Sequence, residues 1–219
     1  MKKFSLILAL LLISMLCFGC NNKADETKTD VDMDLVGVWK LEDESHPELY
    51  VFTEDSEVKI VSGSISFEGT ASFKKNADGS GTYLSNFYYM AGELSYKIDG
   101  DKVTFDDGEG TIQTLKKAQY TAPELKKYDN FNSDNSLIGT WVNAEYSDSY
   151  TFNTDGTATY VMDFGDLEYV SVIDYTYTEK DGKVYFTFDS GEGSQEISSV
   201  YTINGDTLIF DGTAEYTRQ

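Results

Sequence analysis

The stretch Leu35-Val36-Gly37-Val38-Trp39 returns as Leu137-Ile138-Gly139-Thr140-Trp141, 102 residues further along the chain. An aromatic segment follows each copy: Leu49-Tyr50-Val51-Phe52 after the first and Ser149-Tyr150-Thr151-Phe152 after the second. A single Gly-x-Trp pair is weak evidence, but matched landmarks in the same order indicate an internal repeat.

Two further landmarks extend this repeat. The segment 96–105 is similar to 179–186, and Gly108-Glu109-Gly110 is similar to Gly191-Glu192-Gly193. The spacing between these later landmarks is only about 82 residues, so we expect roughly 20 extra residues in the first copy, around Ser62 to Phe73. The sequence therefore predicts two copies of one fold with unequal loops.

Within each copy, apolar and polar residues alternate, which is typical of strands with one buried face. In the second copy these strands are separated by Asn153-Thr154-Asp155-Gly156, Lys180-Asp181-Gly182 and Asn204-Gly205. Asp-Gly and Asn-Gly supply the positive φ angles that tight hairpin turns need. A meander with one apolar face hides that face by closing into a barrel or folding into a sandwich.

The composition agrees with an all-β protein. The chain of 219 residues contains 16 Tyr, 13 Phe and 18 Gly but only 2 Pro. Its two cysteines, Cys17 and Cys20, lie near the N-terminus, so the folded part has no disulfide and depends on aromatic packing. We predict an all-β fold of two tandem small antiparallel meander barrels, following a cleaved lipoprotein signal peptide.

The signal peptide is predicted from the first 20 residues. Lys2 and Lys3 precede an apolar run, 4–16, which is too short for a permanent membrane-spanning helix. The run ends at Gly19-Cys20, which resembles the signal of bacterial lipoproteins. The resemblance implies cleavage after Gly19 and lipidation of Cys20, whereas Cys17 is the poorer acceptor because bulky Leu16 precedes it.

These patterns divide the chain into five parts. A helix is expected at the start of the linker, because Thr121 and Glu124 form a capping box and lysines follow. The predicted parts are a signal peptide (1–19), a lipidated Cys20 with a flexible tether (20–34), a first β domain (35–120), a linker with a short helix (121–136) and a second β domain (137–219).

The Leu-x-Gly-x-Trp openings and the turn 153–157 resemble the small lipocalin-like domains found, often repeated, in bacterial lipoproteins. The resemblance covers 137–219 better than 35–120, where Thr53-Glu54-Asp55-Ser56 lacks the turn glycine. It implies a meander of about eight strands in each copy and a mostly unassigned function, and it brings no catalytic residues. At this length we expect the barrel interiors to be filled by aromatic side chains.

The residues do not favour catalysis or nucleic-acid binding. The only histidine, His46, lies before a proline among acidic residues, which is typical of an exposed loop. No nucleophile elbow, zinc-binding or phosphate-binding motif is present. Because no such motif is found, the protein is predicted not to be an enzyme. A formal net charge of −21 repels phosphate, so nucleic acid is excluded as a partner.

No cofactor is expected, and calcium is the only ion with candidate ligands. Carboxylates supply the hard oxygen ligands that calcium takes, although their order here is not that of an EF-hand. Ordinary acidic turns are the alternative explanation. The weak candidates are Asp99, Asp101, Asp106, Asp107 and Glu109.

Aromatic residues are the remaining candidates for binding. Trp39 and Trp141 either plug one end of a barrel or line a ligand site. The run Phe87-Tyr88-Tyr89-Met90 is either a buried strand or an exposed protein-binding patch.

Three functions stay open from the sequence. The first is a non-catalytic binding module for a small apolar ligand or an envelope component, anchored by lipid to the outside of the bacterial cell membrane. The second is a protein-interaction or structural module with filled barrels and no small-molecule ligand. A hydrolase is a minor third. The first predicts a void open at one barrel end, and the second predicts a large exposed aromatic patch.

Overall fold

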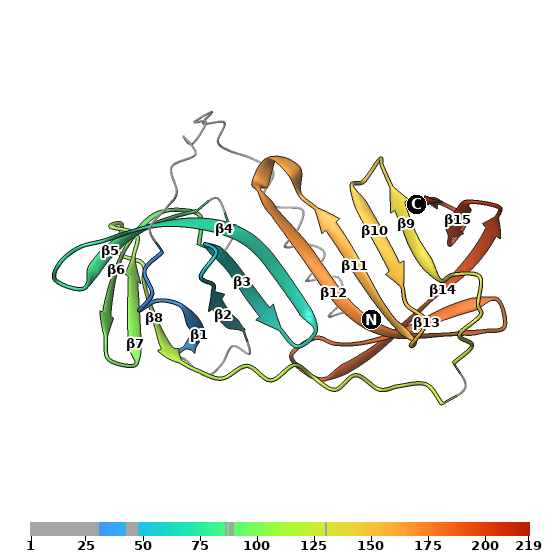
Figure 1. Cartoon of the computed structure of the whole chain (residues 1–219), viewed down its shortest axis with the longest axis horizontal. Coiled ribbons are helices and arrows are strands. Elements are labelled where there is room, and N and C mark those ends of the chain that lie inside the picture. The colour runs from blue at the N-terminus through green and yellow to red at the C-terminus, as the bar shows by residue number, and fades with distance from the viewer. Residues whose placement is uncertain (1–30, 43–47, 86, 88–89, 130) are drawn as a thin grey trace.

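The computed structural model describes residues 31–42, 48–85, 87, 90–129 and 131–219. These residues form sixteen strands, all paired antiparallel, and no α-helix. Two barrels of eight strands lie next to each other, and the segment that connects them runs along one side of both (Figure 1). The predicted all-β architecture of two meander barrels is confirmed.

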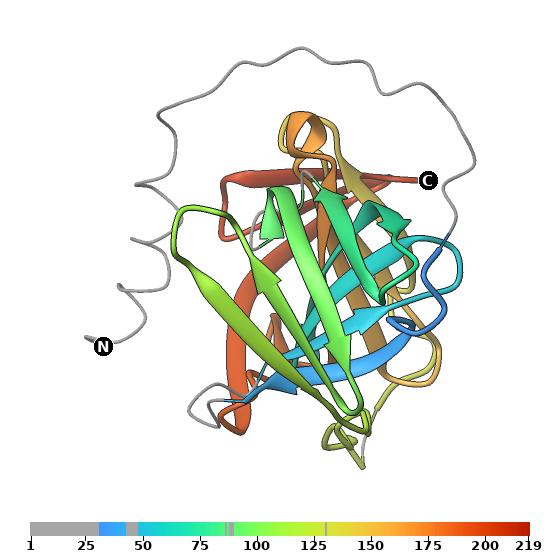
Figure 2. The same cartoon turned by 90° about the vertical axis from the view of Figure 1, so that its left-hand side faces the viewer.

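Barrel 1 is a simple meander in which each strand pairs with the next, β8 returns to β1, and the pairing of β4 with β5 completes the ring. Figure 2 shows this barrel in front of its neighbour. Its strands are β1 (Gly37–Leu41), β2 (Leu49–Phe52), β3 (Glu57–Ser62), β4 (Ile65–Lys75), β5 (Ser80–Ser85), β6 (Gly92–Asp99), β7 (Lys102–Asp106) and β8 (Ile112–Lys117).

Barrel 2 repeats the same order, with β16 returning to β9 and β12 pairing with both β11 and β13. A short 3-10 helix, η2 (Gly165–Leu167), precedes its fourth strand. Its strands are β9 (Gly139–Asn143), β10 (Asp148–Phe152), β11 (Thr157–Asp163), β12 (Tyr169–Lys180), β13 (Lys183–Asp189), β14 (Ser194–Asn204), β15 (Thr207–Phe210) and β16 (Ala214–Arg218).

The spacing between equivalent strands stays close to 102 residues over the whole length. β4 and β12 begin 104 residues apart, and β8 and β16 begin 102 apart. The expected insertion of about 20 residues in the first copy is therefore wrong. The error arose because similar glycine turns occur twice in each barrel. Gly100, between β6 and β7, corresponds to Gly205 between β14 and β15, and not to Gly182 between β12 and β13.

The predicted turns form as expected. Gly156 and Gly205 take φ angles of +83° and +62°, and the hairpin between β12 and β13 turns through Asp181-Gly182 with both φ angles positive. In barrel 1, Ser56 occupies the place of Gly156 and takes the same left-handed conformation, with φ +65°. The missing glycine therefore weakens the sequence signal without changing the fold.

The helix predicted at 121–128 does not form, and this segment is extended. The carbonyl of Lys126 accepts a hydrogen bond from the hydroxyl of Thr176 on β12 at 2.5 Å. The hydroxyl of Tyr128 likewise lies 2.6 Å from that of Thr187. An isolated helix of two turns is marginal in water, so these contacts along barrel 2 outweigh the capping box.

Aromatic side chains fill both barrels. In barrel 1, the ring of Phe52 lies 6.0 Å from that of Phe105, and Phe73 lies 5.5 Å from Tyr83. In barrel 2, Phe152 lies 4.9 Å from Tyr177. Each interior is thus occupied by its own side chains, as expected for small eight-stranded barrels.

The two barrels share one sheet through β4 and β12. The register runs from Ile65 opposite Ile173 to Gly69 opposite Tyr169. In each barrel the next strand leaves this part of the long strand unpaired: β5 pairs only with 71–75 and β13 only with 176–180. Each barrel therefore covers the edge that the other leaves open.

Side chains also cross the joint. Tyr169 of β12 belongs to the core of barrel 1, where its ring lies 5.9 Å from Phe87. Ile65 of β4 packs against the core of barrel 2. At the tip of the β3–β4 hairpin, the Ser64 N–H donates to the carbonyl of Asp189, and the Asp189 N–H donates to the Ser64 hydroxyl, both at 2.9 Å.

Gly63 permits this close approach. It takes φ +60°, and a Cβ atom there would lie 2.4 Å from the carbonyl oxygen of Asp189 and 2.5 Å from the nitrogen of Gly191. Both contacts are with backbone of barrel 2, which cannot move aside as a flexible side chain can. Only glycine fits between the hairpin tip and the end of β13.

We predict that Gly63→Ala is more destabilising than Gly100→Ala by about 2 kcal/mol or more. Both positions carry the same left-handed backbone cost, with φ angles of +60° and +63°, but Gly100 has open space around its Cβ position. Urea denaturation of both variants measures the difference. Equal losses would show that the hairpin tip does not press against barrel 2.

Candidate functional site

Both tryptophans of the repeated motif are fully buried, with 0% of their surface exposed. The indole N–H of Trp39 donates to the carbonyl of Leu35 at 2.7 Å, and that of Trp141 donates to the carbonyl of Leu137 at 2.6 Å. The leucine four residues before each tryptophan thus supplies a carbonyl acceptor for the indole N–H, which is the one polar group of the buried ring.

A cation covers each tryptophan. The Lys117 ammonium lies 5.0 Å from the ring centroid of Trp39, and the Arg218 guanidinium lies 4.1 Å from that of Trp141. Arg218 also donates to the carbonyls of Ile138 and Ser136, at 2.7 and 2.8 Å. We call this the closed end of each barrel; it holds residues 32–36 in barrel 1 and 131–138 in barrel 2.

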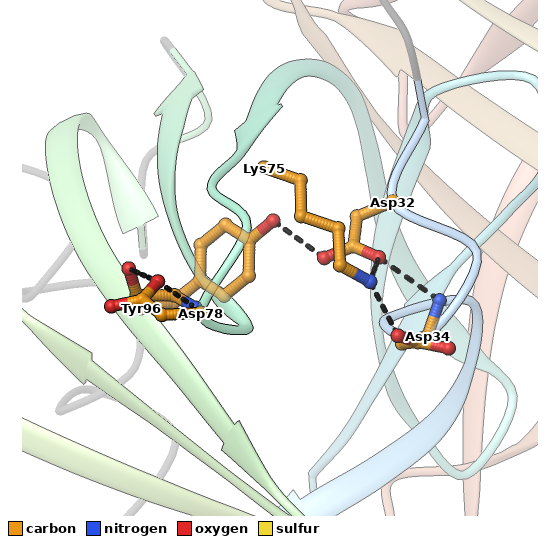
Figure 3. A network of polar contacts seen from close by, with 6 residues as sticks. Asp32, Asp34, Lys75, Asp78 and Tyr96 are labelled. Carbon is orange, nitrogen blue, oxygen red and sulfur yellow. Dashed lines mark hydrogen bonds and ion pairs between the residues drawn. The ribbon is translucent and has the colours of Figure 1, made fainter.

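A buried carboxylate lies at the closed end of barrel 1 (Figure 3). Asp32 is 3% exposed; its Oδ1 accepts hydrogen bonds from the Lys75 ammonium at 2.8 Å and the Asp34 N–H at 3.1 Å, and its Oδ2 accepts from the Tyr96 hydroxyl at 2.7 Å. Burial raises the pKa of Asp32, but these three donors outweigh burial and hold that pKa below its ordinary value. Lys75 also pairs with Asp34.

Barrel 2 has a neutral amide near the corresponding place. The Asn135 Nδ2 donates to the Tyr177 hydroxyl at 3.3 Å and to the Asn132 carbonyl at 2.8 Å, while its Oδ1 accepts from the Leu137 N–H at 3.0 Å. The buried polar side chain at the closed end is therefore an ion-paired carboxylate in barrel 1 and a neutral amide in barrel 2.

The opposite, open end of barrel 1 carries a recess of about 200 Å³ beside the β7–β8 loop (107–111). Met90 and Phe105 are buried there, Leu94 is partly buried, and polar residues lie toward the loop. The recess is lined by Met90, Ala91, Leu94, Phe105, Asp107, Thr111 and Gln113.

A second recess, of about 220 Å³, lies between the barrels. The connecting segment supplies one part of its lining and the β3–β4 hairpin another. Both recesses are smaller than sites for drug-sized ligands, which span roughly 300–1,000 Å³. The inter-barrel recess is lined by Leu49, Val61, Gly63, Tyr120, Thr121, Pro123, Asp189 and Gly191.

Residues 124–210 match the family model of the lipocalin-like domain. The match begins in the connecting segment and ends with β15, so it covers most of barrel 2. Lipocalin-like domains are generally non-catalytic folds that bind small molecules. Barrel 1 contains the same repeated motif and has the same order of strands, so it is structurally equivalent to this barrel.

No curated protein matches the chain. Among solved structures, the DNA polymerase III beta chain of Streptococcus pneumoniae TIGR4 is similar to it at 14% identity. That alignment covers 83% of this chain and 56% of the polymerase chain, with a TM-score of 0.15, which is too low to support an argument about fold or function.

The calcium candidates lie at two ends of barrel 1. Asp99 and Asp101 flank the turn at the closed end, whereas Asp106 ends β7 and is followed by Asp107 and Glu109 at the open end. In the second group, Asp107 Oδ1 already accepts the N–H groups of Glu109 and Thr111, at 2.8 and 3.0 Å. Among the residues that the structure describes, no three His, Cys, Asp or Glu residues are grouped to hold a metal ion.

Several other predicted residues lie outside the described part of the chain. These are Cys20 with the signal peptide, His46, and Tyr88 and Tyr89 of the aromatic run. The flanking Phe87 and Met90 are buried in the core of barrel 1. Across the described ranges, no helix is long and apolar enough to cross a membrane.

The role of Asp32 was not predicted from the sequence. It lies in the segment expected to be a flexible tether (20–34), yet the structure holds Asp32 and Asp34 against barrel 1. The only available signal was the pairing of Asp32 with Lys75 and Tyr96, which lie more than 40 residues away in the chain. Such long-range pairing is not visible in one sequence.

We predict that Asp32→Asn lowers the free energy of unfolding by about 1–3 kcal/mol at pH 7. Because the folded pKa of Asp32 lies below its unfolded value near 3.8, its contribution is complete above about pH 4 and is lost as the pH falls through the folded pKa. Urea denaturation between pH 2 and 7 therefore shows a shallower acid limb in Asp32→Asn than in the wild type.

Asp34→Asn is the matched control, because the Asp34 side chain is 69% exposed and its ion pair is screened by solvent. It should leave the acid limb nearly unchanged. A pH profile of Asp32→Asn that superimposes on the wild-type profile would contradict the role given to this carboxylate.

Proposed function

We propose that this protein is a non-catalytic binding module, anchored by lipid to the outside of the bacterial cell membrane, which binds a small apolar ligand or an envelope component. The lipocalin-like match of barrel 2 supports the binding class. The recess at the open end of barrel 1 carries the proposal, because it combines an apolar floor with access from solvent.

The size and lining of this recess define the ligand. Met90, Leu94 and Phe105 offer apolar surface, and Met adapts readily to different shapes. A volume of about 200 Å³ is slightly larger than a cavity of roughly 150 Å³ that holds benzene. A single aromatic ring or a short branched alkyl group therefore fits, and a larger envelope component would insert only such a group.

The filled interiors favour the second candidate, a protein-interaction or structural module. Neither barrel needs a ligand to complete its core, since rings such as Phe52 and Phe105 already pack against one another. Exposed apolar side chains, including Ile112 at 62% and Leu84 at 50%, are available for protein contact. The ligand experiment distinguishes the two candidates.

We predict that toluene binds saturably at the open end of barrel 1, with NMR shifts at the methyl groups of Met90 and Leu94. Leu94→Trp fills the recess and should weaken this binding at least tenfold. Leu84→Trp is the control, because Leu84 lies on β5 and is half exposed. Thermal denaturation checks that both variants are folded.

Binding that is not saturable, or that is equally strong in both variants, would contradict the ligand site. That result would favour the interaction module and direct the search to protein partners by cross-linking in the envelope.

The proposed anchor rests on the leader sequence, in which Lys2 and Lys3, the apolar run 4–16 and Gly19-Cys20 follow the order of a lipoprotein signal. In a bacterial host supplied with labelled palmitate, we expect Cys20→Ser to lose the label and to accumulate as uncleaved precursor. The matched variant Cys17→Ser should keep the label. Labelled Cys20→Ser protein would overturn the anchor at this residue.

A further inference from the structure

A second buried carboxylate lies at the open end of barrel 2. Asp148 is the first residue of β10 and is 6% exposed. Because alternate residues of a strand share a face, Asp148, Tyr150 and Phe152 form one row facing the barrel interior. Phe152 is part of the core and Tyr150 packs against it, so Asp148 is the member of this row nearest the open end of the barrel.

Only one oxygen of this carboxylate is satisfied. Asp148 Oδ2 accepts hydrogen bonds from the hydroxyls of Tyr160 at 2.8 Å and Tyr216 at 2.9 Å. Asp148 Oδ1 is buried and has no hydrogen-bond partner among the described residues. A carboxylate oxygen buried without a donor is costly, so this atom marks a place for a donor from outside the chain.

The same protein shows what completes such a site. At the closed end of barrel 1, Asp32 accepts a tyrosine hydroxyl on one oxygen and the ammonium of Lys75 on the other. Asp148 has the tyrosine hydroxyls on one oxygen, but no ion pair joins it to a cation within the described ranges. Compared with Asp32, Asp148 lacks the ammonium.

The surroundings of Asp148 suit a cation. The ring of Tyr150 lies 4.6 Å from that of Tyr160, 5.5 Å from that of Tyr216 and 5.4 Å from that of Phe210. Ring faces attract cations, and Tyr150 and Tyr160 are only partly buried, so they are reachable from the rim. Burial raises the pKa of Tyr160 and Tyr216, which keeps their hydroxyls protonated as donors to Asp148.

We propose that the open end of barrel 2 binds the primary ammonium group of a small organic cation, with Asp148 Oδ1 accepting an N–H and the rings of Tyr150 and Tyr160 contacting the charged group. A primary ammonium supplies the donor that Oδ1 lacks, which a quaternary ammonium cannot do. The net charge of −21 also attracts cations to the protein. This site lies in the other barrel from the apolar recess and does not depend on it.

The test is an NMR titration of the full chain at fixed ionic strength with n-propylammonium chloride, 1-propanol and tetramethylammonium chloride. We expect saturable shifts at Asp148, Tyr150, Tyr160 and Tyr216 with propylammonium, and binding at least tenfold weaker with each of the other two. An equal response to 1-propanol would overturn the role of charge. An equal response to tetramethylammonium would overturn the role of the N–H donor.

Two variants locate the site. Asp148→Asn should weaken propylammonium binding at least tenfold, whereas Asp206→Asn, which removes the same charge from the exposed β14–β15 turn, should not. Equal losses would indicate diffuse attraction to an acidic surface and overturn the proposal. No saturable response in the wild type would also overturn it. If Asp148→Asn does not fold, the comparison of the three solutes on the wild type decides alone.

A free amine and the ethanolamine headgroup of a lipid share this chemistry. Titration of the full chain with glycerophosphoethanolamine, with glycerophosphocholine as the matched control, separates these sources. Glycerophosphoethanolamine binding at least tenfold tighter than propylammonium binding, and abolished by Asp148→Asn, supports the lipid headgroup. Propylammonium binding that is as tight or tighter supports a free amine.

Discussion

The antiparallel pairing of β4 with β12 is the constraint on which the arrangement of the molecule depends. Each barrel has a fifth strand that covers only half of its long fourth strand, which leaves an edge of unpaired N–H and C=O groups. The partner barrel satisfies that edge with its own fourth strand. The register is symmetric about Ser66 opposite Val172. These two residues are equivalent, because Ser66 pairs with Val61 of β3 and Val172 pairs with Val161 of β11, so the joint has the character of a two-fold interface within one chain.

The two barrels share one backbone but differ in the chemistry of their ends. Barrel 1 places its buried carboxylate, Asp32, at the closed end, where Lys75 completes it, and leaves an apolar recess at its open end. Barrel 2 ties its closed end with Asn135 and places Asp148 at its open end. The duplicated fold thus has two open ends of different chemistry, one with an apolar recess and one with a buried carboxylate.

Local patterns were predictable from the sequence, and long-range ones were not. The Trp39 and Trp141 motif and the Asp181-Gly182 turn act over a few residues, so their signals are complete in the sequence. The extra residues expected in the first copy were wrong because similar Asp-Gly and Asn-Gly turns recur within the barrels. The helix expected at 121–128 was wrong because contacts with barrel 2, such as that of the Thr176 hydroxyl with the Lys126 carbonyl, hold this segment extended. Asp148 is one of 38 acidic residues, and only the fold shows that it is buried.

The most direct test of this account is amide hydrogen exchange in the joint, at residues 65–69 and 169–173. If β4 and β12 are central strands of one sheet, these amides exchange as slowly as those of the barrel strands, and they open only with global unfolding. Exchange as fast as at exposed turns such as Gly100 would show that the barrels are separate units and would contradict the joint.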